Sequence, residues 1–217
     1  MRDLLLRSLA IMFCFSTFVF AQRNSGSDFH KNFGLGIKFG INRLNADELT
    51  KTEQKTGGIA GIDFHYVAMD AIELILDVSY GLNDTNWFLG EAHVTRIYQF
   101  NYTIGFRFYP PQLNLGELLP FFGFGAGLYN WYFTNSDKSI YDRNDLEKFR
   151  GEELKFLSIG LNLQAGIRYK LSSKFVLDGN FRYNFIQSKD NRGKFGDADK
   201  NEQSYDLSLG IVFLFAK

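Results

Sequence analysis

The chain has little cysteine, little proline and no excess of charge of either sign. Its 217 residues include 1 Cys and 3 Pro, and 24 Lys and Arg residues balance 24 Asp and Glu residues. A single cysteine excludes a disulfide framework, a cysteine-based zinc site and an iron–sulfur cluster. A net charge of zero removes the bulk attraction to phosphate on which nucleic-acid binding depends. The composition therefore predicts neither a cofactor nor a nucleic-acid partner.

The chain also lacks a hydrophobic run long enough to cross a membrane as a helix, which takes about 20 residues. Its most apolar stretch, 9–20, has twelve residues, follows two arginines and leads into a Val-Phe-Ala tripeptide that ends at Ala21. This is the pattern of a secretory signal peptide. We therefore expect 1–21 to be a signal peptide cleaved after Ala21, and 22–217 to be one exported domain. An uncleaved anchor is the alternative, and the short run disfavours it.

Glycine and aromatic residues are abundant instead, with 21 Gly and 17% aromatics. The exported part alternates large apolar with small or polar residues, which is the period of a β-strand. Eight runs show this alternation, at about 33–42, 58–68, 71–82, 92–108, 121–133, 155–171, 174–186 and 204–215. Most are as long as the 9 to 11 residues that a tilted membrane strand needs. The pattern predicts an all-β fold, an eight-stranded antiparallel up-and-down transmembrane β-barrel.

Alternation alone also fits a soluble sandwich or a lipocalin-like barrel, so the character of the two faces decides. The apolar face is almost free of charge in the middle of every run and carries most of the aromatic residues. The other face holds polar residues and twelve glycines. A water-facing strand surface so rich in glycine would be unstable, and soluble proteins rarely expose large apolar patches. We therefore expect the apolar face to contact outer-membrane lipid and the glycines to line a narrow interior.

The connections between the runs fall into two classes. Those near 69–70, 109–120 and 172 are short or contain proline, whereas 44–57, 83–91, 134–154 and 187–203 are longer or strongly polar. Short periplasmic turns and long extracellular loops are typical of outer-membrane barrels. With eight strands, both termini then lie on the periplasmic side. Five outward tyrosines near the loop side are expected to form an aromatic girdle at headgroup level: Tyr80, Tyr98, Tyr132, Tyr183 and Tyr205.

Three features resemble a known family. They are the signal-like tripeptide, the segment 120–127 with the sequence Pro-Phe-Phe-Gly-Phe-Gly-Ala-Gly, and a last strand that contains Phe213 and Phe215. The whole exported part resembles the small eight-stranded outer-membrane barrels, the group that includes the OmpA transmembrane domain, OmpX and the opacity-type proteins. The resemblance implies that Phe213 and Phe215 act as a C-terminal signal for the barrel-assembly machinery.

The inward face of the predicted barrel carries charges of both signs. Four are positive and four negative: Lys38, Arg107, Arg168 and Arg182, and Asp63, Glu73, Asp77 and Asp178. Because eight strands leave an interior that side chains fill, and because isolated buried charges are very costly, we expect these groups to pair. A structural plug of ion pairs is the favoured interpretation. A narrow ion path through rearranging pairs is the alternative, and catalysis is the third.

Two further patterns bear on chemistry. Asp63 and His65 lie two residues apart on one face, so an acid–base pair is conceivable, but no serine is placed as an obvious nucleophile. The segment 197–201 has carboxylates at alternate positions, which can converge on Ca²⁺, but it departs from the EF-hand pattern afterwards. We expect a hydrogen-bonded lumen histidine and a solvated acidic loop.

The sequence therefore predicts a monomeric, non-enzymatic protein of the outer membrane. Its expected role is structural or lies in surface interaction, with an unidentified extracellular ligand bound through the loops. A narrow porin-like channel for ions or small solutes is the first alternative. A lipid-modifying enzyme of the outer membrane is the second, and the missing nucleophile set disfavours it.

Overall fold

The computed structural model describes nine segments of the chain: 33–45, 56–69, 71–89, 92–113, 115–135, 148–149, 152–153, 155–187 and 201–215. They belong to the second of two compact units, Lys31–Lys217. The predicted signal peptide 1–21 and most of the acidic segment 197–201 lie outside the described residues. Among those that are described, no helix is long and apolar enough to cross a membrane.

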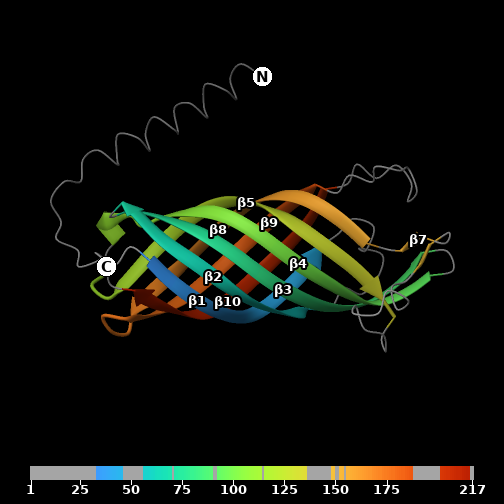
Figure 1. The fold of residues 1–217 in the computed structure, drawn as a ribbon, viewed down its shortest axis with the longest axis horizontal. Coiled ribbons are helices and arrows are strands. Elements are labelled where there is room, and N and C mark those ends of the chain that lie inside the picture. The colour runs from blue at the N-terminus through green and yellow to red at the C-terminus, as the bar shows by residue number, and fades with distance from the viewer. Residues whose placement is uncertain are drawn as a thin grey trace, which may run out of the picture. The chain divides into compact units, whose positions relative to one another are not determined.

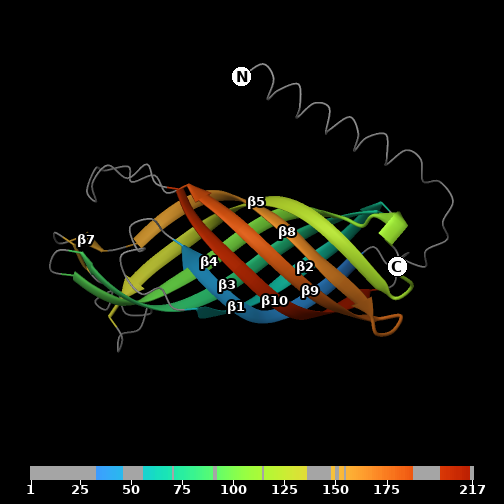
Figure 2. The same ribbon diagram turned by 180° about the vertical axis from the view of Figure 1, so that it is seen from behind.

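Eight antiparallel strands close into a barrel, which confirms the predicted fold (Figures 1 and 2). They are β1 (Phe33–Asn45), β2 (Gly57–Met69), β3 (Ile72–Leu89), β4 (Ala92–Phe108), β5 (Leu118–Thr134), β8 (Lys155–Lys170), β9 (Phe175–Gln187) and β10 (Asn201–Phe215). Each pairs with the next along the chain, and β1 pairs with β10 to close the ring. A 3-10 turn at Pro111–Leu113 precedes β5, and a small hairpin of β6 (Lys148–Phe149) and β7 (Glu152–Glu153) precedes β8.

The two faces of each strand differ as the alternation predicts. Large apolar side chains point away from the barrel and remain exposed, with Phe39 and Leu161 each 64% exposed. Their neighbours along the chain point inward, and Asn162 is 2% exposed. A chain folded in water would reverse this order, because exposed apolar patches of this extent are unfavourable there. An apolar outer band around a polar interior is the arrangement of a barrel in lipid.

Inward glycines make room for the long side chains that fill the interior. A Cβ atom added to Gly166 would lie 2.5 Å from the ring of Phe121. One added to Gly123 would lie 2.9 Å from the side chain of Gln164. These separations are too short for carbon atoms in contact, so a larger residue at either position would push a buried neighbour away.

The two ends of the barrel differ in their connections. At one end, called here the turn end, β1 begins, β10 finishes and three short connections join the strands. One of these turns is tied by the hydroxyl of Ser172, which accepts hydrogen bonds from the backbone N–H groups of Lys174 and Phe175 at 3.2 and 3.1 Å. At the opposite end, called the loop end, the chain makes the other four connections.

One predicted loop is instead a hairpin. The polar segment 83–91 was expected to be a loop, but β3 continues to Leu89 and β4 starts at Ala92. Asn83 pairs with Ile97 and Asp84 with Arg96, with a register shift before Trp87. The prediction was wrong because it took polar residues to mark a loop, whereas the backbones of β3 and β4 stay paired beyond the length needed to cross the bilayer. For the same reason β10 begins at Asn201, three residues earlier than expected.

Candidate functional site

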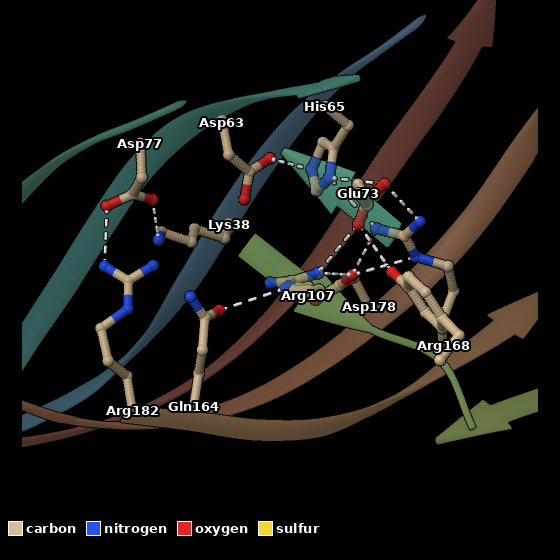
Figure 3. Close-up of polar contacts among 11 residues, drawn as sticks. Lys38, Asp63, His65, Glu73, Asp77, Arg107, Gln164, Arg168, Asp178 and Arg182 are labelled. Atoms are coloured by element: carbon tan, nitrogen blue, oxygen red, sulfur yellow. Dashed lines mark hydrogen bonds and ion pairs between the residues drawn. The ribbon is translucent and has the colours of Figure 1, made fainter. Parts of the chain in front are cut away.

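Charged side chains from five strands, β2, β3, β4, β8 and β9, meet inside the barrel near its turn end (Figure 3). Arg168 of β8 is 1% exposed and is central to this group. Its Nη1 atom donates to Glu73 Oε1 at 2.7 Å, and its Nη2 atom donates to Asp178 Oδ2 at 3.0 Å. One guanidinium thus bridges carboxylates from β3 and β9. Such a bridge offsets the cost of removing three charges from water only because the hydrogen-bond geometry is good.

Arg107 of β4 is the second positively charged partner of Asp178. Its Nη1 atom donates to Asp178 Oδ2 at 2.6 Å, and its Nε atom donates to Gln164 Oε1 at 3.1 Å. Its guanidinium carbon also lies 4.0 Å from the centre of the Phe121 ring, a cation–π contact. The guanidinium is therefore held by a carboxylate, an amide and an aromatic face.

His65 of β2 lies between two carboxylates. Its Nε2 atom is 3.0 Å from Asp63 Oδ1, and its Nδ1 atom is 3.2 Å from Glu73 Oε1. Arg168 Nη2 is also 3.1 Å from Nδ1. The contacts of this ring are thus two acids and one arginine, and none of them is a nucleophilic hydroxyl.

Tyr109 closes the cluster on the side of the turn end. It lies directly after β4, and its hydroxyl donates to Glu73 Oε2 at 2.6 Å. Burial raises the pKa of Tyr109 well above its usual value, so the hydroxyl keeps its proton and remains a donor. Its ring also lies 5.4 Å from the guanidinium carbon of Arg168.

A second, smaller ion cluster lies further toward the loop end. Asp77 of β3 accepts hydrogen bonds from Lys38 of β1 and from Arg182 of β9, the latter at 2.9 Å. The hydroxyl of Ser79 also donates to Asp77, at 3.2 Å. Because β1, β3 and β9 lie on different sides of the ring, these bonds cross the lumen (Figure 3).

Amides and one carboxylate, Asp206, replace the ion pairs beyond this second cluster. Asn42 donates to Asp206 Oδ1, and Asn184 Nδ2 donates to Asp206 Oδ2 at 2.9 Å. Tyr129 donates its hydroxyl proton to Asn184 Oδ1 at 3.0 Å. Several neighbouring amide atoms have no hydrogen-bond partner within the described part of the chain. We call this zone the amide layer and define it by Asn42, Gln99, Asn101, Asn184 and Asp206.

Apolar side chains lie at both ends of the lumen. At the turn end, Val176, Val212 and Leu214 pack together and are buried. At the loop end, buried apolar residues form a collar. We define the collar as Leu44, Ile97, Trp131, Phe133 and Ile186. We call Val176, Val212 and Leu214 the apolar plug. From turn end to loop end the lumen therefore contains the apolar plug, the large ion cluster, the small ion cluster, the amide layer and the collar.

The structure brings seven of the eight predicted lumen charges into direct contact with a charge of opposite sign. The eighth, Asp63, contacts His65. Asp206, which was not among the eight predicted charges, is also buried. Among the described residues, the lumen thus holds four buried Lys and Arg side chains and five buried carboxylates. Protonated His65 would supply a fifth positive charge.

The five predicted girdle tyrosines lie in two groups on the outward face. Tyr183 of β9 and Tyr205 of β10 are in contact, with ring centres 4.8 Å apart and ring planes tilted by 45°. Tyr80 lies 6.1 Å from Tyr98, and Phe100 joins Tyr80 to Tyr132 at 5.0 and 5.9 Å. Tyr98 differs from the other four because it is only 8% exposed. It is therefore packed under its neighbours. The role of all five tyrosines as a girdle at headgroup level stays a prediction.

The predicted assembly signal lies at the end of β10. The rings of Phe213 and Phe215 meet edge to face at 5.0 Å, and Phe213 lies 5.2 Å from Phe175 of β9. Phe215 pairs with Phe33, the first residue of β1, where the barrel closes. These residues thus belong to the closing seam of the barrel, whereas their recognition by assembly machinery stays a prediction.

No group of three or more His, Cys, Asp or Glu side chains in the described segments is arranged to hold a metal ion. Residues 197–200 of the segment 197–201, which was considered for Ca²⁺, lie outside those segments.

Comparison with known proteins agrees with this architecture. A model of the outer membrane protein β-barrel domain family matches residues 9–213. OprG, an outer membrane protein of Pseudomonas aeruginosa, is 16% identical, with a TM-score of 0.54 over 87% of this chain and 98% of that one. Neisserial surface protein A is 17% identical, with a TM-score of 0.53 over 84% and 97%. At such identities the two structures share the fold alone. No curated protein matches the sequence.

The family match covers almost the whole chain, and the closed barrel with an apolar outer band and a polar lumen fits it. The chain belongs to the outer membrane protein β-barrel domain family.

Proposed function

We propose that this protein is a plugged barrel whose function lies in surface interaction at the loop end. The observation that carries the proposal is the ion network centred on Arg168, which spans the lumen between β3, β8 and β9. A lumen filled in this way serves stability. Recognition is then left to the segments that join the strands outside the membrane.

The energetics of the network support a closed lumen. Removing one member of a buried ion pair costs about 3–5 kcal/mol, because the partner is left as an uncompensated buried charge. Arg168 bonds two carboxylates, and one of these also bonds Arg107. Opening a path for a solute would separate several such pairs at once. The apolar plug of Val176, Val212 and Leu214 lies beyond them.

Surface interaction is supported by the length of the connections at the loop end. The segments 136–147 and 188–200 are rich in charged and polar residues. Loops held on a rigid scaffold are where binding residues concentrate. We propose that these segments face the cell exterior, that they contact an extracellular ligand and that the barrel acts as a monomer without catalytic activity.

The test compares loop removal with a change in the lumen. In one variant, two-residue turns replace 136–147 and 188–200. In the other, Arg182→Ala removes one bond to Asp77. Each is expressed in a strain that lacks the native gene, and heat-dependent gel mobility reports folding. We expect the trimmed barrel to fold and to lose its cell-surface phenotype, because closing shorter loops changes stability little.

The Arg182→Ala variant should show the reverse, with lower stability but with surface interaction retained by the folded fraction. A trimmed barrel that restores the full surface phenotype would contradict the proposal. So would a folded Arg182→Ala barrel that has lost it.

A narrow channel for ions or small solutes is the second candidate. The unpartnered atoms of the amide layer favour it, because a polar lumen without internal partners attracts water. In that case Arg182→Ala would change conductance or ion selectivity, and loop removal would mainly change gating.

We further propose that the chain reaches the outer membrane after cleavage between Ala21 and Gln22, and that the barrel-assembly machinery reads Phe213 and Phe215. The Val-Phe-Ala junction supports the cleavage site. The intact mass of the membrane-extracted protein should correspond to residues 22–217. A mass that includes residues 1–21 would contradict cleavage.

A further inference from the structure

We infer that the amide layer is a hydrated site that admits small, neutral, hydrogen-bonding molecules from the loop end. This inference goes beyond the surface role proposed above and does not depend on it. Its basis is a set of polar side chains that are almost fully buried and that lack partners in the described part of the barrel.

The members of the amide layer lie close together. Asn42 contacts Asp206, Asp206 contacts Asn184, and Asn184 contacts Tyr129. Tyr129 is the cross-strand partner of Asn101. These residues come from β1, β10, β9, β5 and β4, which are five of the eight strands of the barrel. Gln99 precedes Asn101 by two residues in β4 and therefore lies closer to the loop end.

Burial makes the missing bonds costly. Asn42, Gln99 and Asn101 are at most 1% exposed. Within the described segments, both polar atoms of Gln99 and both of Asn101 have no partner, and neither does the side-chain oxygen of Asn42. Each buried polar atom left unsatisfied costs about 1–3 kcal/mol. A dry amide layer would therefore be strongly destabilising, and molecules that complete these bonds are expected in it.

The unpartnered atoms also indicate what kind of molecule binds. Amide nitrogens donate and amide oxygens accept, and both kinds occur among the free atoms. A cation would satisfy only the acceptors, and an anion only the donors. Water and small neutral molecules with hydroxyl or amide groups satisfy both. Gly81 lies beside these atoms, and a Cβ added there would be in ordinary van der Waals contact with Gln99, at 3.5 Å.

The two boundaries of the layer set the direction of access. On the side of the turn end, Asp77 joins Lys38 and Arg182 across the lumen. On the side of the loop end, the collar is apolar and contains Ile97, Trp131 and Ile186. Apolar constrictions exclude charged solutes more strongly than neutral ones. A molecule in the layer could leave toward the turn end only by separating these ion pairs. We therefore expect access through the collar, which favours small uncharged molecules.

Thiol accessibility tests the inference directly. In a Cys14→Ser background, Gly81→Cys places a thiol in the layer where a side chain fits, and Ile75→Cys places the control thiol among the ion pairs. The probes are neutral methyl methanethiosulfonate and its trimethylammonium-ethyl analogue, which is cationic. We expect the neutral probe to modify Gly81→Cys at least about tenfold faster than Ile75→Cys, because only the former thiol contacts solvent. At Gly81→Cys the cationic probe should react more slowly than the neutral one.

Equal rates at the two positions, or no reaction at either, would overturn the inference. A cationic probe that reacts as fast as the neutral one at Gly81→Cys would also overturn it, because the entrance would then not select uncharged molecules. Heat-dependent gel mobility verifies folding, and Asn101→Cys replaces Gly81→Cys if that variant does not fold.

A second measurement uses the unmodified protein. Magnetisation transfer from water to side-chain amides by NMR should reach Gln99 and Asn101. The internal control is Gln164, whose oxygen is bonded to Arg107 in the ion-paired zone and whose amide group should show no transfer. Transfer to Gln164 alone, or to none of the three, would contradict a hydrated amide layer.

Discussion

The two halves of the lumen fill the same narrow space with different chemistry. Toward the turn end, the large ion cluster combines acids, guanidinium groups and an imidazole, joined by contacts from 2.6 Å, between Arg107 and Asp178, to 3.2 Å, between His65 and Glu73. Toward the loop end, the amide layer leaves many polar atoms without partners among the described residues. Charged groups must pair when they are buried, whereas neutral amides can be completed by water. The difference suggests that one half seals the barrel and the other stays open to small molecules.

The largest effect is expected at the centre of the sealed half. Arg168→Ala would leave Glu73 and Asp178 each without one hydrogen-bonded positive partner. We expect the free energy of unfolding to fall by about 3–5 kcal/mol, measured by reversible urea unfolding in lipid vesicles. The matched control is Arg96→Ala, which breaks an exposed pair with Asp84 and should cost about 0–1 kcal/mol. Equal losses would show that the lumen network has no special role in stability.

The next effect tests the orientation of the strands on which both halves depend. Leu161 points to lipid and Asn162 into the lumen. Leu161→Arg should lower the free energy of unfolding by about 2–4 kcal/mol if the residue lies near the middle of the bilayer. Asn162→Ser should cost far less, because it keeps a polar group in a polar interior. If the two variants unfold at the same urea concentration, the faces of β8 are assigned incorrectly.

A smaller effect is expected in the open half. Asn184→Ala removes the acceptor of the Tyr129 hydroxyl and the donor to Asp206 and to the Ser204 hydroxyl. If water takes the place of the lost amide, the loss in unfolding free energy should be about 1 kcal/mol, as for an ordinary hydrogen bond. A loss as large as that of Arg168→Ala would remove the contrast between the halves.

The alternation of residues predicted the barrel, its strand number and its two faces, because the side-chain period of a strand is fixed by backbone geometry. The inward position of Lys38, Glu73 or Arg168 followed from the same period. The ends of strands were harder to predict. Asn83 and Asp84 resemble loop residues, yet β3 continues through them because β4 provides a paired backbone.

The pairing within the lumen could not be predicted from the sequence. Whether Lys38 meets Asp77 or another acid depends on the registers of β1 with β2 and of β2 with β3, which the sequence of one strand does not fix. Tyr109 lies in a turn, so no alternation marked it as a partner of Glu73. Asp206 was on the inward face of its run, and a complete charge count of that face would have found it.

Electrical conductance of the refolded, unmodified protein in a planar lipid bilayer tests the central claim most directly. Because ion pairs and an apolar plug close the half of the lumen at the turn end, the account predicts no steady conductance above that of the bare bilayer. A hydrated amide layer does not change this expectation, since it ends at the pairs between Asp77, Lys38 and Arg182. A large, steady, ion-selective conductance would contradict the plugged barrel and would support the channel.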